Sequence, residues 1–245
     1  MTRQPLVLLP GMLGSAALWD GVCARIGDIA LPWSARTDLD DSVPAMAASV
    51  LAQASPTFAL VGHSLGAIVA LEVQRQAPRR VTQLILLNAS ARGADAAQQA
   101  AWSGWARRTE IGEFDVVAGE LARSNLPTSR RGDSALVDLS EAMARAVDAD
   151  GFLRQLRAQS TRPDSLARLA DITVSVTVIS GEEDEVCPPP LQGEFAAGAP
   201  TSELVSLRGG HMLPIENPDD VSAELRRVLA RSLPSEAGFD SRRSG

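Results

Sequence analysis

Four short, uninterrupted apolar runs most constrain the fold of this chain. They cover residues 6–9, 58–61, 84–87 and 174–179, and weaker strand patterns cover 29–33 and 203–207. Continuous apolar strands are typical of a parallel sheet with helices on both faces, because neither face of such a strand meets water. Helical patterns separate the runs. The sequence therefore predicts a doubly wound, mostly parallel α/β fold that binds ligands at the carboxyl ends of its strands.

Two helical patterns are well delimited. Residues 65–77 carry apolar side chains at helical spacing and stop before Pro78, so an amphipathic helix is expected to begin directly after Ser64. Residues 218–231 open with a proline and two aspartates and close with arginines, the charge order that suits a helix dipole. We expect a final helix there.

One connection is far longer than a simple crossover between strands. Residues 89–171 put roughly 80 residues between two apolar runs, so an extra unit must follow the strand at 84–88. Helical patterns fill it at 94–108, 113–123, 134–149 and 152–159. The expected parts are a core of 1–90 and 170–233, an inserted helical cap of 91–169 and a flexible tail of 234–245.

Composition narrows the class of partner. The chain of 245 residues can bury a sizeable core, and its formal charge of -7 disfavours nucleic acid and anionic membranes, which repel an acidic surface. Cys23 and Cys187 are too few for a disulfide framework and are expected to be reduced thiols. No apolar run is long enough for a bilayer span or a signal peptide. We expect a cytoplasmic protein acting on a small molecule; its oligomeric state stays open.

The segment 62–66, Gly-His-Ser-Leu-Gly, has the G-x-S-x-G pattern at a junction between strand and helix. Glycines two residues either side of Ser64 leave room for a sharp turn that presents the hydroxyl above the sheet. A serine needs an adjacent base to become a good nucleophile. The pattern therefore predicts that Ser64 is the nucleophile of an enzyme, provided that a base lies close to it in the fold.

The chain contains two histidines. Neighbouring side chains diverge on a tight turn, so His63 is interpreted as a packing or wall residue. His211 follows Gly209-Gly210 in a loop between a strand pattern and the last helix, and it is the candidate base. An acid should orient that base, and the run 182–185 offers four acids. Two distant histidines do not assemble a zinc site, and this chemistry needs no organic cofactor, so none of either kind is expected.

In order, these motifs resemble those of the α/β-hydrolase family, whose triad runs serine, acid, histidine. Family members often carry a G-x-x-D pattern with a proline soon after it, which matches Gly181 to Asp184 with Pro188. Their histidine often lies in a Gly-His loop, as His211 does here. The resemblance implies a catalytic triad of Ser64, Asp184 and His211.

The resemblance also implies an oxyanion hole. The family takes one backbone donor from the loop after an early strand and the other from the residue after the nucleophile. These positions correspond to the amides of Met12 and Leu65. The chain has Pro10 where many members have histidine, which leaves the backbone donors unchanged.

The expected reaction is a two-step acyl transfer on a small or medium, largely apolar carboxylic ester or lactone. No basic cluster lies near the motifs, which disfavours a strongly anionic substrate. Candidate wall residues of the pocket are Trp102, Trp105, Leu126 and Phe152. Relatives with the same triad also cleave carbon-carbon bonds, open enol-lactones, act as thioesterases or make peracids, and these reactions stay open. A ligand-binding protein with slow or no turnover is the alternative of another class.

Overall fold

The computed structural model describes residues 3–231 and contains one six-stranded sheet. The strands are β1 (Gln4–Leu9), β2 (Ala30–Ser34), β3 (Phe58–His63), β4 (Val81–Leu87), β5 (Val176–Gly181) and β6 (Ser202–Leu207). Their order is β2-β1-β3-β4-β5-β6, and every neighbouring pair is parallel. The predicted doubly wound α/β fold is confirmed. The expected tail, 234–245, lies outside the described residues.

The two weak strand patterns belong to the two edge strands. Strand β2 pairs only with β1, and β6 pairs only with β5. Along β6, exposed and half-buried residues alternate, whereas every residue of β3 and β5 is buried. An edge strand has fewer neighbours to cover it, so it does not need a continuous apolar run.

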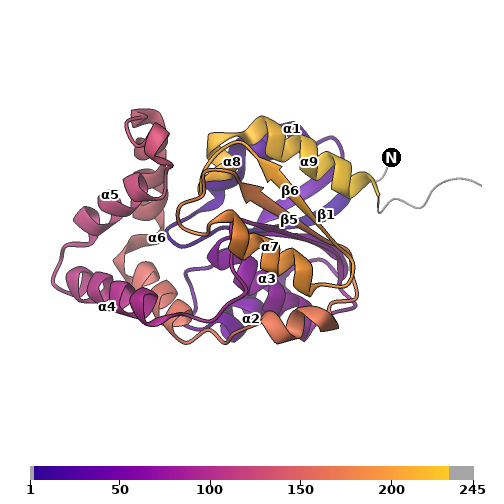
Figure 1. Cartoon of the computed structure of the whole chain (residues 1–245), viewed down its shortest axis with the longest axis horizontal. Helices are drawn as coiled ribbons and strands as arrows, with labels where there is room; N and C mark the ends of the chain where they lie inside the picture. The colour runs from indigo at the N-terminus through magenta and orange to yellow at the C-terminus, as the bar shows by residue number, and fades with distance from the viewer. Residues whose placement is uncertain (1–2, 232–245) are drawn as a thin grey trace, which may run out of the picture.

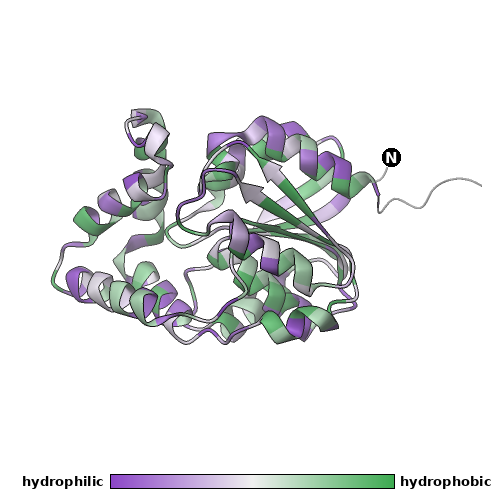
Figure 2. Ribbon diagram, viewed as in Figure 1, coloured by the Kyte–Doolittle hydropathy of each residue, from purple (hydrophilic) through white to green (hydrophobic). Residues whose placement is uncertain are grey.

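Helices cover both faces of the sheet (Figure 1). One face carries α1 (Asp20–Ile26), α8 (Leu213–Glu216) and α9 (Pro218–Ala230), preceded by a 3-10 turn at Ala16–Trp19; the other carries α2 (Val43–Gln53), α3 (Leu65–Gln76) and α7 (Pro189–Gly198). Strand residues alternate between two cores, with Leu8 and Val61 in one and Leu9 and Leu60 in the other. Figure 2 shows the strands as hydrophobic bands between these helical layers. Among residues 3–231, no helix combines the length and apolarity needed to cross a bilayer.

Three helices fill the long connection between β4 and β5. They are α4 (Ala96–Glu110), α5 (Phe114–Ser124) and α6 (Ser134–Ser160), with 3-10 turns at Thr128–Arg130 and Leu166–Asp171. Figure 1 shows the three helices on the side toward which the arrowheads of β5 and β6 point. Helix α6 breaks at Asp148 (φ 64°, ψ 175°), whose Oδ1 accepts the Gly151 N–H at 2.8 Å. The break lies close to the boundary between the two helices that the sequence predicts, 134–149 and 152–159.

Candidate active site

Ser64 lies at a strained turn between β3 and α3. Its backbone has φ 51° and ψ −117°, a conformation that costs energy for a residue with a side chain. The turn requires close approach of the backbone on either side. A Cβ on Gly66 would lie 2.1 Å from the Leu9 carbonyl oxygen, and one on Gly62 would lie 2.4 Å from the Gly66 carbonyl oxygen. Both glycines are therefore needed to bring α3 against the ends of β1 and β3.

The structure brings the three predicted triad residues together in one hydrogen-bonded chain. The Ser64 Oγ lies 3.1 Å from the Nε2 of His211, and the Nδ1 of His211 lies 3.1 Å from both carboxylate oxygens of Asp184. His211 and Asp184 are only 4% and 3% exposed. A carboxylate accepts hydrogen bonds, so Nδ1 carries the proton and Nε2 is left to accept from the serine hydroxyl. This arrangement can deprotonate an attacking hydroxyl.

Asp184 is held by several donors besides His211. Its Oδ1 accepts the N–H groups of Val186 and Cys187 at 2.9 and 2.8 Å, and its Oδ2 accepts the Asn88 side chain at 2.7 Å. Burial alone raises the pKa of this carboxyl, but the interaction with His211 and these hydrogen bonds outweigh burial and bring the pKa below its usual value. Asp184 is thus kept ionised, while the three glutamates of the run 182–185 are exposed.

The loop that carries His211 is supported by a second carboxylate. The two oxygens of Glu216 accept the N–H groups of Gly210 and Met212 at 2.7 and 2.8 Å. Burial raises the pKa of Glu216 above its ordinary value, while the two amide bonds oppose that effect. Glu216 therefore fixes the conformation of the loop, because it accepts the backbone N–H groups on both sides of His211.

The two predicted oxyanion donors, Met12 and Leu65, lie close to Ser64. Leu65 is the first residue of α3, and Met12 lies in the turn after β1 and lines the same cavity as Ser64. Neither amide donates a hydrogen bond to another residue in the described range. The next residue, Leu13, has a φ of 58° and donates its N–H to the Gln155 side chain of α6 at 2.9 Å. A helix outside the sheet layers therefore fixes the turn that carries Met12.

A cavity of about 230 Å3 opens at Ser64. Its apolar walls include Met12, Ile68, Trp102, Trp105, Leu121 and Met212, and its polar walls include Ser90, Gln98, Gln159 and Arg162. Two predicted wall residues, Trp102 and Trp105, line it. The other two, Leu126 and Phe152, do not line it. Leu126 belongs to the buried cluster on the face of the sheet that carries α1 and α9, and Phe152 to the buried cluster of α4, α5 and α6. The prediction for Leu126 and Phe152 rested on their apolar side chains, which fit a helical core as well as the wall of a pocket.

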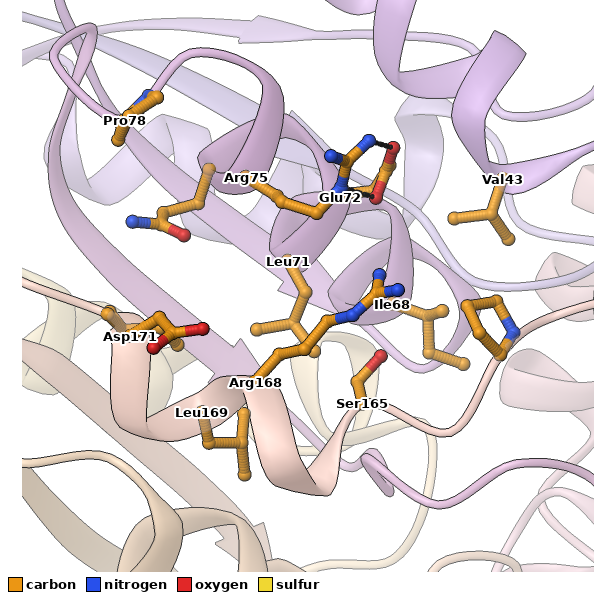
Figure 3. Close-up of a pocket in the computed structure, with 13 residues that line it drawn as sticks. Val43, Ile68, Leu71, Glu72, Arg75, Pro78, Ser165, Arg168, Leu169 and Asp171 are labelled. Atoms are coloured by element: carbon orange, nitrogen blue, oxygen red, sulfur yellow. Dashed lines mark hydrogen bonds and ion pairs between the residues drawn. The ribbon is translucent and has the colours of Figure 1, made fainter.

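A larger cavity, of about 470 Å3, lies on the far side of α3 and contains no predicted site residue. Figure 3 shows Ile68, Leu71 and Glu72 of α3 facing Arg168 and Leu169 of the segment that precedes β5. Glu72 is engaged by Arg75 at 2.7 and 2.6 Å. Ile68 lines both cavities.

Sequence reasoning missed three residues of this site: Asn88, Gln155 and Arg162. Asn88 directly follows the apolar run at 84–87, and a polar residue at the end of a buried strand was a usable signal. The other two had no signal, because their contacts depend on how α6 packs. Within residues 3–231, no group of three His, Cys, Asp or Glu side chains is arranged to hold a metal ion.

Comparisons with known proteins bear on the family and the fold of the chain. The model of a family described as the alpha/beta hydrolase family matches residues 6–224. "Putative carbamate hydrolase RutD" from Escherichia coli O17:K52:H18 is 26% identical over 207 residues, which cover 79% of this chain and 72% of the relative. A thermophilic esterase from Thermogutta terrifontis, solved with malate bound, superposes with a TM-score of 0.85 at 21% identity, over 94% of this chain and 91% of that one. The enol-lactonase from Burkholderia xenovorans LB400 gives 0.83 at 15%, over 94% and 92%.

Proposed function

Since the chain belongs to the alpha/beta hydrolase family, we propose that it is a serine hydrolase that cleaves small carboxylic esters or lactones through an acyl-enzyme on Ser64. The observation that carries the proposal is the hydrogen-bonded chain from Ser64 through His211 to Asp184. It supplies a nucleophile, a base and an orienting acid in the order that acyl transfer needs.

The first half of the reaction acylates the enzyme. The Ser64 Oγ attacks the carbonyl carbon while its proton passes to the Nε2 of His211. The new imidazolium is stabilised by Asp184, which the surrounding hydrogen bonds keep ionised. His211 then gives this proton to the leaving alkoxide as the carbon-oxygen bond breaks. In the second half, water attacks the acyl carbon and loses a proton to His211. His211 passes this proton to the Ser64 Oγ as the bond between that oxygen and the acyl group breaks.

The backbone amides of Met12 and Leu65 are the proposed oxyanion donors. Both are free of acceptors within the described residues and flank Ser64. Two oriented N–H groups stabilise the negative oxygen that forms on the attacked carbonyl, and the loss of one such donor typically costs about 3 kcal/mol of barrier.

The cavity supports a small substrate, and the inserted helices are its proposed cap. A volume of about 230 Å3 lies below the usual range for drug-sized ligands, and most of its walls are apolar. Trp102 and Trp105 come from α4 and Leu121 from α5, so the segment 91–169 supplies much of the wall. We assign to this cap the selection of substrate.

A carbamate is the second candidate substrate class, favoured by the name of the curated relatives at 26% identity. Its carbonyl carbon is open to the same attack by Ser64. A panel of esters, lactones and carbamates of matched size separates the two classes by their kcat/KM values.

The proposal is tested by labelling and by kinetics together. A fluorophosphonate probe should modify Ser64, identified by peptide mass mapping, and Ser64→Ala should abolish both labelling and hydrolysis of p-nitrophenyl acetate and butyrate. Ser103→Ala, an exposed serine on α4, is the matched control and should behave as the wild type. A ligand-binding protein without turnover would take no label and would hydrolyse no ester.

A further inference from the structure

One polar group in the cavity at Ser64 takes no part in the proposed reaction. Arg162 follows α6 and lines the cavity. Its Nη1 donates to the Gln159 Oε1 at 2.7 Å, and its guanidinium carbon lies 5.4 Å from the centre of the Trp102 ring. Its Nε is buried and has no hydrogen-bond partner among residues 3–231. The aromatic ring and the glutamine hold the guanidinium in place, and most of its N–H groups remain available.

Among the described residues Arg162 forms no direct ion pair, although Asp164 and Asp95 lie near enough to attract its charge. Other arginines form ion pairs at the surface, as Arg92 does with Glu194 and Arg108 with Glu120. In the part of the chain that the structure describes, no carboxylate forms an ion pair with Arg162. Burial lowers its pKa, although an arginine stays protonated at any ordinary pH.

The titratable neighbours of Arg162 are engaged elsewhere or neutral. Asp164 accepts two backbone N–H groups, at 3.0 and 2.9 Å. Asp95 caps α4 by accepting a backbone N–H at 2.8 Å. Cys187, which also lines the cavity, has its pKa raised to about 12 by burial, so its thiol carries no charge near neutral pH. Arg162 is half-buried, and no carboxylate of the described residues binds its guanidinium directly. Its unpartnered N–H groups can therefore bind an anion, which points to a counter-ion that arrives with the substrate.

We propose that Arg162 binds a carboxylate of the substrate, so that the hydrolase prefers small esters or lactones that carry one negative charge besides the carbonyl group attacked by Ser64. The inference rests on the proposed function and refines its substrate class. A guanidinium presents parallel N–H groups that match the two oxygens of a carboxylate. Half-esters of short dicarboxylic acids have this chemistry, with an apolar chain between two polar ends.

An anionic substrate differs from the expectation drawn from the absence of a basic cluster near the motifs. A single arginine, remote in sequence from Ser64 and His211, reaches the cavity because α6 ends beside it. The apolar wall remains, so the substrate combines an apolar middle with one charged end.

The kinetic test compares two substrates that differ by one charge. Monomethyl succinate is anionic and dimethyl succinate is neutral, and proton release measures the hydrolysis of both. The wild type should favour the monoester by about tenfold or more in kcat/KM, the effect of one charge-assisted hydrogen bond. Arg162→Leu should remove this preference, and Arg162→Lys should keep part of it. Arg157→Leu, an exposed arginine on α6, makes the same change in net charge and should keep the wild-type ratio.

A binding measurement tests the proposed carboxylate site at Arg162 without turnover. Calorimetric titration of Ser64→Ala with succinate and with its neutral diamide should give at least about tenfold tighter binding of the dianion, and adding Arg162→Leu should remove the difference. If the leucine variant fails to fold, the test is to compare the inhibition constants of succinate and succinamide for the wild type. A wild type that prefers the diester, or that succinate and succinamide inhibit equally, overturns the inference.

The two proposals fail separately. If the fluorophosphonate probe labels Ser64 and esters are cleaved without a preference for the charged one, only the carboxylate site is wrong. If Ser64 takes no label and no ester is cleaved, the hydrolase is wrong, and the titration of Ser64→Ala still reports whether Arg162 binds the anion.

Discussion

The imidazole Nε2 of His63 lies 2.7 Å from the backbone carbonyl oxygen of His211. One histidine of the chain thus holds the backbone of the other, and the two ring centres are 5.1 Å apart. Burial, with a contribution from the neighbouring His211, lowers the pKa of His63 to about 3. His63 is therefore neutral at physiological pH and donates its Nε2 proton to that carbonyl group, so it positions the proposed base and does not act as one.

Replacement of His63 should lower kcat more than it changes KM. His63→Leu leaves the His211 carbonyl oxygen without its buried donor, and we expect a loss of about tenfold in kcat for ester hydrolysis, equivalent to about 1.4 kcal/mol. His63→Gln places an amide N–H near the same point and should recover most of the rate. Equal losses in the two variants would mean that the ring contributes packing alone.

The buried His63 should also make stability depend on pH. Its pKa is about 3 in the folded protein and 6.5 in the unfolded chain. The unfolded chain binds the extra proton between these values, so the stabilisation is complete above pH 6.5 and is lost as the pH falls toward 3. From pH 7.5 to 5.5, the free energy of unfolding should fall by about 1.4 kcal/mol more in the wild type than in His63→Gln. Urea unfolding of both proteins at the two pH values measures this difference. An equal fall in the two proteins would contradict the lowered pKa of His63.

Gly66→Ala should be among the most destabilising substitutions of a small residue. Its Cβ would lie 2.1 Å from the Leu9 carbonyl oxygen, and backbone cannot move aside without separating α3 from β1. We expect a loss of about 3 kcal/mol or more in the free energy of unfolding. Gly104→Ala is the control: it lies inside α4 with nothing closer than 4.0 Å to the new methyl group, and should stabilise the protein by about 0.5 to 1 kcal/mol.

Ile68→Ala should shift the substrate range toward longer acyl chains. Ile68 lines both the cavity at Ser64, of about 230 Å3, and the larger one shown in Figure 3, of about 470 Å3, so we expect its truncation to open the first toward the second. The kcat/KM ratio of p-nitrophenyl octanoate to butyrate should rise by about tenfold or more, because the added methylenes gain a place to be buried. Leu71→Ala removes a similar side chain that lines only the larger cavity, and it should leave the ratio unchanged.

Local sequence signals predicted the sheet because the central strands are buried along most of their length. The runs before Ser64 and before Asp184 are β3 and β5, and both lie inside the sheet. The predicted start of β5 was two residues early, since Val174 and Ser175 precede the strand. A strand boundary depends on hydrogen bonds with its neighbours, which an apolar pattern does not specify.

The site divides in a similar way. The structure joins Ser64, Asp184 and His211, each of which follows a strand and has a local motif. Gln155 and Arg162 have no such motif. Gln155 contacts Leu13, 142 residues earlier in the sequence. Arg162 lies over the Trp102 ring of α4. Both contacts depend on how the inserted helices pack, which a local pattern does not specify. The pattern of apolar residues in the inserted helices also did not separate Trp102, which lines the cavity, from Phe152, which fills the helical core.

The hydrogen bond from the Leu13 N–H to Gln155 links two tasks that a hydrolase of this kind could keep apart. Helix α6 ends beside Arg162, where the proposal places recognition of the substrate. Near that same end, Gln155 holds the turn beside Met12, where charge is proposed to develop during the reaction. A rebuilt insert that recognised a new substrate would therefore also have to supply a new support for that turn. Changes of specificity in this protein are accordingly expected to be easier on α4 and α5 than along α6.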